Sequence, residues 1–140
     1  MNQLQPLQYP VSEFVFMERN KVVTDSLTMA QMFGKEHKNV MRDIEVQLEK
    51  LFEANETEWS QLNFEHTQYK HYQNKQWYPK FNLTEDAFSI VAMSYITPEA
   101  MKMKIKFLHE FKKMKKHIQK LQQKPQSVED AIIYSMNELK

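Results

Sequence analysis

The spacing of apolar residues changes several times along the chain, and each change marks an expected element. Two short apolar runs, at 14–17 and 21–24, predict two strands. Arg19 and Asn20 lie between them, and Asn tolerates the left-handed backbone of a tight turn. We therefore expect a β-hairpin here, preceded by a flexible arm over residues 1–12, which are mostly polar and contain two prolines.

Helical spacing of apolar residues follows on both sides of Gly34, the only glycine in the chain. Glycine is most useful where φ must be positive, as just past a helix end. We expect one helix from about Leu27 to Phe33, with Ser26 as its N-cap and Asp25 adding a favourable negative charge. A sharp corner then leads to a second helix over about 36–54, with an apolar face of Val40, Met41, Ile44, Leu48 and Leu51.

The middle of the chain is polar and then aromatic. Residues 54–63 are predicted to form a polar connector without regular structure. The alternating, aromatic-rich segment after it predicts a second hairpin, with strands over about 64–72 and 77–83 and a tip at 73–76. Pro79 cannot donate to a strand ladder, which places its strand at an edge or a bulge.

Helical signals dominate the last third. Thr84, followed by two acids, opens a helix to about Tyr95, and Pro98 suits the first turn of a long helix to about residue 123. Its expected apolar stripe is Met101, Ile105, Leu108, Phe111, Met114 and Ile118. Pro125 ends it, and a capping box at 127–130 opens an amphipathic segment that continues to residue 140.

This order of elements predicts an α+β fold, a winged helix-turn-helix-like domain with two β-hairpins and long carboxy-terminal helices. We expect the domain to span residues 13–97, with a basic amphipathic helix over 98–124 packed on it. A carboxy-terminal helix over 127–140 would serve dimerisation or lead to a missing further domain.

Composition and charge narrow the class of protein. The chain has 140 residues and no cysteine, and it has neither an 18-residue apolar run nor a signal-peptide pattern, so we expect one cytoplasmic domain. The net charge is only +1, but the charges are segregated: residues 45–58 hold five Glu and one Lys, and residues 101–124 hold nine Lys and one Glu. Such segregation creates local fields that attract charged partners.

The corner at Gly34 has two interpretations. It is either an αα corner that only packs a core or a helix-turn-helix whose second helix enters the major groove of DNA. Hydrogen-bond donors at the start of the second helix favour DNA: Lys35, His37, Lys38, Asn39 and Arg42. The start of the first helix and the tip of the aromatic hairpin, acting as a wing, add the candidates Ser26, Thr28, Lys70, Asn74 and Lys75.

Two segments carry a resemblance to a known family. "SLTMAQMFGKEHKNVMRDI" and, further on, "FNLTEDAFSIVAMSYITPEAMKMKIKFLHEFKKM" resemble the phage regulatory protein Rha family over roughly residues 15–118. Ala87 stands where that family usually has glycine, which a helix tolerates. The resemblance implies a phage or prophage transcriptional regulator in the cytoplasm of the bacterial host, nucleoid-associated when bound to DNA. The alternative is an antirepressor that contacts a host or phage repressor protein.

Catalysis and metal binding find little support in the sequence. His66 and His71 would point to opposite faces of one strand, and His109 and His117 are eight residues apart on a helix. One glycine cannot build a glycine-rich phosphate loop. We therefore expect no catalytic residue, no metal, no cofactor and no membrane partner.

Assembly is the last expectation from the sequence. The nine-lysine helix either covers a solvated face, contacts phosphates or meets the acidic 45–58 segment of another copy. Useful specificity usually needs two recognition helices on a symmetric site. We therefore expect a homodimer formed through Ile118, Leu121, Ile132, Met136 and Leu139. The competing outcomes are a monomer in which 127–140 folds back on its own domain, and a segment that begins a missing second domain.

Overall fold

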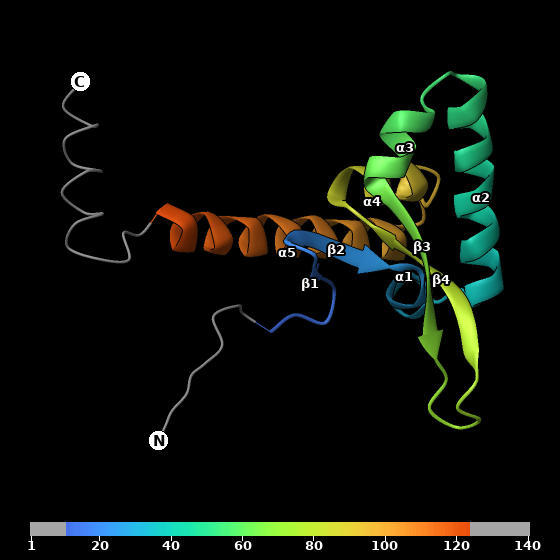
Figure 1. Ribbon diagram of the computed structural model, residues 1–140, viewed down its shortest axis with the longest axis horizontal. Helices are drawn as coiled ribbons and strands as arrows, with labels where there is room; N and C mark the ends of the chain where they lie inside the picture. The colour runs from blue at the N-terminus through green and yellow to red at the C-terminus, as the bar shows by residue number, and fades with distance from the viewer. Residues whose placement is uncertain (1–10, 124–140) are drawn as a thin grey trace.

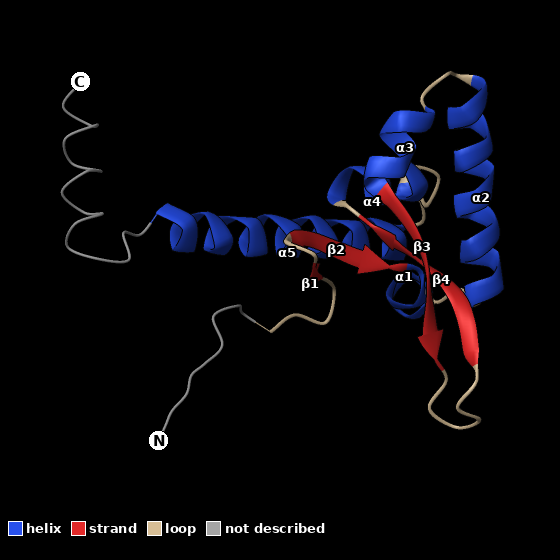
Figure 2. Ribbon diagram, viewed as in Figure 1, coloured by secondary structure: helices blue, strands red, loops and turns tan. Residues whose placement is uncertain are grey.

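The computed structural model describes residues 11–123, which form an α+β fold of helices around a small sheet (Figures 1 and 2). The predicted helix over 127–140 and most of the predicted amino-terminal arm lie outside the described residues. Along the chain the elements are β1 (Phe16–Glu18), β2 (Lys21–Asp25), α1 (Ser26–Phe33), α2 (His37–Glu53), α3 (Thr57–Asn63), β3 (Phe64–Lys70), β4 (Trp77–Leu83), α4 (Glu85–Ala92) and α5 (Pro98–Gln123).

Both predicted hairpins are confirmed, and they join into one antiparallel sheet of four strands in the order β1-β2-β4-β3. Arg19 and Asn20 form the first turn with φ of 50° and 67°, the positive values that a primed turn requires. The two hairpins meet where Thr24 pairs with Leu83 and Asp25 with Asn82. This junction places the start of α1 directly against β4.

The sheet also accommodates Pro79. Pro79 lies opposite Gln68 of β3, in the outer half of β4, whereas β2 pairs with the other end of that strand. Its missing N–H therefore faces away from a ladder, as expected for a local edge position.

Two predictions about local structure are wrong. The segment predicted to be a connector contains α3, in which Trp59 contacts Phe64 with ring centroids 6.4 Å apart and Ser60 is buried. A helix of seven residues depends on such packing rather than on its own periodicity. The N-cap of α1 is Asp25, not Ser26, because the Asp25 carboxylate accepts the Thr28 N–H at 2.8 Å.

The core is built on phenylalanines, and it corrects the predicted stripe of α5. Phe107 and Phe111 are fully buried against Phe88 of α4. Met101 and Ile105 are instead 45% and 65% exposed. The buried stripe of α5 consists of Phe107, Phe111 and Met114, with half-buried Ile118 one turn further on. The predicted stripe did not include Phe107.

A membrane-spanning helix must be both long and apolar. None of the described helices is both long and apolar enough to cross a bilayer.

Candidate nucleic-acid interface

The corner between α1 and α2 is closed by backbone hydrogen bonds around Gly34. Gly34 has φ of 66°, and its N–H and that of Lys35 bond back to the carbonyls of Gln31 and Ala30. An αL residue after a helix satisfies the last carbonyls in this way. Ala30, four residues before Gly34, is buried. The predicted break at Gly34 is therefore confirmed.

The amino-terminal end of α2 carries positive charge toward solvent. The N-cap residue is Glu36, whose side chain makes no capping hydrogen bond, and the first turn that follows it, described in full, has no acidic side chain. Lys38 and Arg42 are exposed one turn apart. The Lys38–Glu36 pair is 3.9 Å apart between two exposed side chains, a geometry that contributes little to stability.

The β3–β4 hairpin stands beside this end of α2. The rings of His37 and Tyr69 are 6.1 Å apart at their centroids and meet edge to face. Figure 1 shows the hairpin projecting past the amino-terminal end of α2, so both point toward the same end of the molecule. We call this surface the cationic end and define it by its six exposed predicted contacts, Lys35, Lys38, Arg42, Lys70, Asn74 and Lys75.

Within the cationic end, three side chains have structural surroundings that limit them. Lys35 lies over the Tyr95 ring, with Nζ 4.3 Å from the centroid. Asn74 accepts the Gln76 N–H and donates to the Tyr78 hydroxyl, both at 2.9 Å, so it shapes the hairpin tip. Lys70 alternates to the strand face opposite Tyr69.

Thr28, His37 and Asn39 are half-buried, and Ser26 is fully buried. The predicted DNA contact at Ser26 is therefore wrong, because β4 covers its side chain. The Ser26 hydroxyl accepts the Phe81 N–H at 3.0 Å and lies 2.9 Å from Nε2 of His37. The next pair in the β2–β4 register would be Ser26 with Phe81, so the hydroxyl continues the ladder by one bond after β2 has ended.

A buried ion pair lies beside these hydrogen bonds. We call the whole group the Ser26 junction (Asp25, Ser26, His37, Lys80 and Phe81). Lys80 donates to Asp25 at 2.8 Å, and both side chains are largely buried. Burial lowers the pKa of the His37 imidazole below its usual value, and the Asp25 carboxylate only partly opposes this. A neutral imidazole can accept the Ser26 O–H at Nε2. The junction thus joins both helices of the corner to the hairpin.

The opposite charge lies at the far end of α2. Glu45, Glu49 and Glu53 are exposed along its second half, away from the hairpin. The gradient along α2 gives the helix one end suited to a polyanion and one that repels it.

The two predicted dimer contacts that the structure describes lie on α5, away from the corner between α1 and α2. Ile118 and Leu121 lie in the last described turns of α5, half-buried and 37% exposed. Ile132, Met136 and Leu139 lie outside the described residues, so the dimer stays a prediction.

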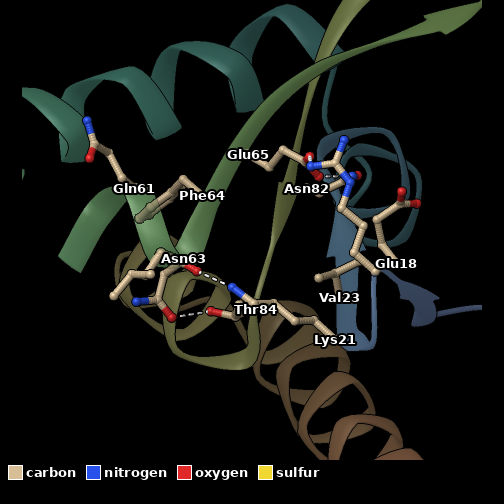
Figure 3. A pocket seen from close by; sticks show the side chains of 11 residues that line it. Glu18, Lys21, Val23, Gln61, Asn63, Phe64, Glu65, Asn82 and Thr84 are labelled. Atoms are coloured by element: carbon tan, nitrogen blue, oxygen red, sulfur yellow. Dashed lines mark hydrogen bonds and ion pairs between the residues drawn. The ribbon is translucent and has the colours of Figure 1, made fainter. Parts of the chain in front are cut away.

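A small polar pocket of about 230 Å³ lies between the first hairpin, the end of α3 and β3 (Figure 3). Several of its polar groups pair with one another: Arg19 with Glu65 at 2.8 Å, and Thr84 with Asn63 at 2.6 Å. No three potential metal ligands gather among residues 11–123. This pairing favours a structural role for the pocket.

Fold and surface together define a small α+β protein in which a sharp two-helix corner and a projecting hairpin share one cationic end. The chain belongs to the phage regulatory protein Rha family, whose model matches residues 24–116. It is also similar to an uncharacterized protein of Haemophilus influenzae strain Rd, 35% identical over 123 residues. That match covers 87% of this chain and 64% of the relative's length. No solved structure matches the chain.

Proposed function

We propose that this protein is a phage or prophage transcriptional regulator that binds duplex DNA through a winged helix-turn-helix. In this arrangement α2 is the recognition helix and the β3–β4 hairpin is the wing. The observation that carries the proposal is the cationic end, where exposed donors lie on the first turns of α2 and on the hairpin that projects past them (Figure 1).

The roles of individual residues follow from their chemistry. Residues near the start of a recognition helix reach base edges, and a guanidinium makes bidentate contacts to guanine. Exposed Arg42 is therefore the proposed base-reading residue. Lys38 and Lys75 are point charges at separate places on the same surface, suited to backbone phosphates.

The first experiment measures binding of a random-sequence duplex by fluorescence anisotropy over a salt series. We expect affinity to fall with salt, and the slope of log K against log[salt] to drop by about one for Lys38→Ala and for Lys75→Ala. Lys50→Ala is the matched control, because it removes one exposed lysine from the acidic half of α2. Absence of duplex binding at low salt would refute the proposal, as would equal effects at Lys38 and Lys50.

Base reading is tested separately by selecting preferred sites from a duplex library. Arg42→Ala should lose about 1–3 kcal/mol of discrimination at one base position while retaining most binding to random duplex. If Arg42→Ala weakens all duplexes equally, Arg42 contacts phosphate only.

The antirepressor alternative predicts a protein partner. A repressor retained on the immobilised protein after nuclease treatment, together with no duplex binding, would favour that function over the proposed one. Charge reversal at Arg42 should then leave the partner bound.

A further inference from the structure

A second, larger groove lies on the opposite side of Lys21 from the small pocket. Its volume is about 690 Å³, and it is bounded by the first hairpin, α3, the start of α4 and the second half of α5. Its apolar lining is Val22, Trp59, Leu62 and Ile118. Leu62 is 62% exposed, an unusual state for a leucine beside a half-buried tryptophan. The groove is a surface that lacks a cover among the described residues.

The shape of the groove matches a helix lying alongside α5. The α5 residues that line it are Lys115, Ile118, Gln119 and Gln122. Their spacing of i, i+3, i+4 and i+7 is one face of a helix over two turns. Figure 1 shows this half of α5 running out from the body beyond α3 and α4. A second helix packed on this face would also reach Leu62.

We propose that the groove holds the carboxy-terminal segment 128–139 of the same chain, packed antiparallel to α5 with its apolar side inward. This segment lies outside the described residues, and its sequence predicts an amphipathic helix with Val128, Ile132, Met136 and Leu139 on one side. In the sequence, Pro125 follows shortly after the groove-lining Gln122 and predicts a helix end, and Ser127 restarts a helical pattern. A return over residues 124–126 is a typical connection between antiparallel helices.

Charge supports the same occupant. Residues 127–140 hold three acids and one lysine, and Lys115 of α5 lines the groove. Glu85 already uses Lys112 and Lys115, at 2.8 and 2.9 Å, which shows that this face of α5 accepts carboxylates. An acidic helix lying here would bring further carboxylates to the exposed Lys115.

Connectivity favours the same chain over a second copy. Four residues lie between Gln123 and Val128, so the two are at most about 18 Å apart. A short linker of this kind holds the segment at an effective concentration of about millimolar, which exceeds that of a second copy at micromolar protein.

Trp59 is a built-in reporter for the groove. The other tryptophan, Trp77, lies on β4 in the hairpin, so Trp77→Phe leaves Trp59 as the single tryptophan, which can be excited selectively over the tyrosines. In that background Ile132→Glu should shift Trp59 emission to longer wavelength and raise its quenching by acrylamide. Asn137→Glu is the matched control, because position 137 lies on the other side of the expected helix, and it should leave emission unchanged. Unchanged emission in Ile132→Glu would overturn the proposal.

The absence of cysteine makes cross-linking clean. An antiparallel return places Ile132 beside Ile118, so Ile118→Cys combined with Ile132→Cys should form a disulfide within one chain on mild oxidation. The single-cysteine variants serve as controls. A disulfide found only in covalent dimers would overturn the proposal in favour of a second copy, and absence of any disulfide would count against this register and this occupant alike.

Discussion

Removing the Ser26 hydroxyl is the most informative perturbation of the fold, because Ser26 is fully buried at the meeting point of α1, α2 and β4. In Ser26→Ala the Phe81 N–H, 3.0 Å from the lost oxygen, remains buried without that partner. An unsatisfied buried N–H costs about 1–3 kcal/mol. The bond to His37 adds less, because the imidazole is half-buried and water can replace the hydroxyl. We therefore expect a loss of roughly 2 kcal/mol in the free energy of unfolding.

Urea unfolding, followed by circular dichroism, measures this loss. The midpoint should fall while the m-value stays constant, since the surface exposed on unfolding is unchanged. Ser94→Ala is the control, because Ser94 is exposed in the loop after α4, and its effect should stay within about 0.5 kcal/mol. Faster hydrogen exchange at the Phe81 amide would locate the effect. Stability of Ser26→Ala within 0.5 kcal/mol of the control would refute the reasoning.

Three further predictions concern the corner. Burial lowers the pKa of His37 in the folded protein, so as pH falls the imidazole is protonated in the unfolded chain first. The free energy of unfolding should therefore drop as pH falls below about 6.5, and level off below the pKa of the folded state. His37→Phe should flatten this pH dependence, as measured by urea unfolding. Tyr95→Phe removes a 2.6 Å bond to Asp43 and should cost about 1.5 kcal/mol, and a double-mutant cycle with Asp43→Asn should show coupling. Gly34→Ala meets no described atom within 4 Å, so it should cost only the backbone strain of φ 66°, about 1 kcal/mol, and Gly34→Asn should cost less in thermal unfolding.

The elements that the sequence predicts correctly have local causes. Asn20 in the first turn, Gly34 after α1, Thr84 as N-cap of α4 and Pro98 at the start of α5 each act through their own backbone preferences or short-range hydrogen bonds. Such signals need only a few neighbouring residues, so they can be read without the fold.

The features that the sequence does not predict depend on distant partners. α3 is held by the contact of Trp59 with Phe64 and by burial of Ser60, and neither leaves a repeating pattern in seven residues. The joining of the two hairpins depends on the register of β2 against β4, which are more than fifty residues apart in the chain. Asp25 is a local hint of this contact. Aspartate is as good an N-cap as serine, so an N-cap at Asp25 leaves the Ser26 hydroxyl free to bond to another strand.

Among the residues predicted to contact DNA, a positive charge is a better indicator of solvent exposure than hydrogen-bonding capacity. Every lysine and arginine predicted to contact DNA is exposed, because these side chains are seldom buried without a partner. Small polar side chains carry no such preference: Ser26 is buried, and Asn74 shapes the hairpin tip. The sequence does not predict the contact of Tyr69 with His37. Nothing local distinguishes Tyr69 from the other aromatic residues of β3 and β4.

The Ser26 junction also bears on how the proposed DNA surface is formed. The chain passes from β2 into α1 without a loop, and the Ser26 hydroxyl then ties α1 to β4 and to the first residue of α2. The junction therefore ties the start of α2 to the base of the hairpin, at Phe81, in the free protein. Less ordering is needed on binding when contact groups are already in place, and that saving appears as affinity. Ser26 is buried and is not expected to touch DNA. Its substitution should nevertheless weaken the proposed DNA binding, to the extent that the hairpin becomes more mobile relative to α2.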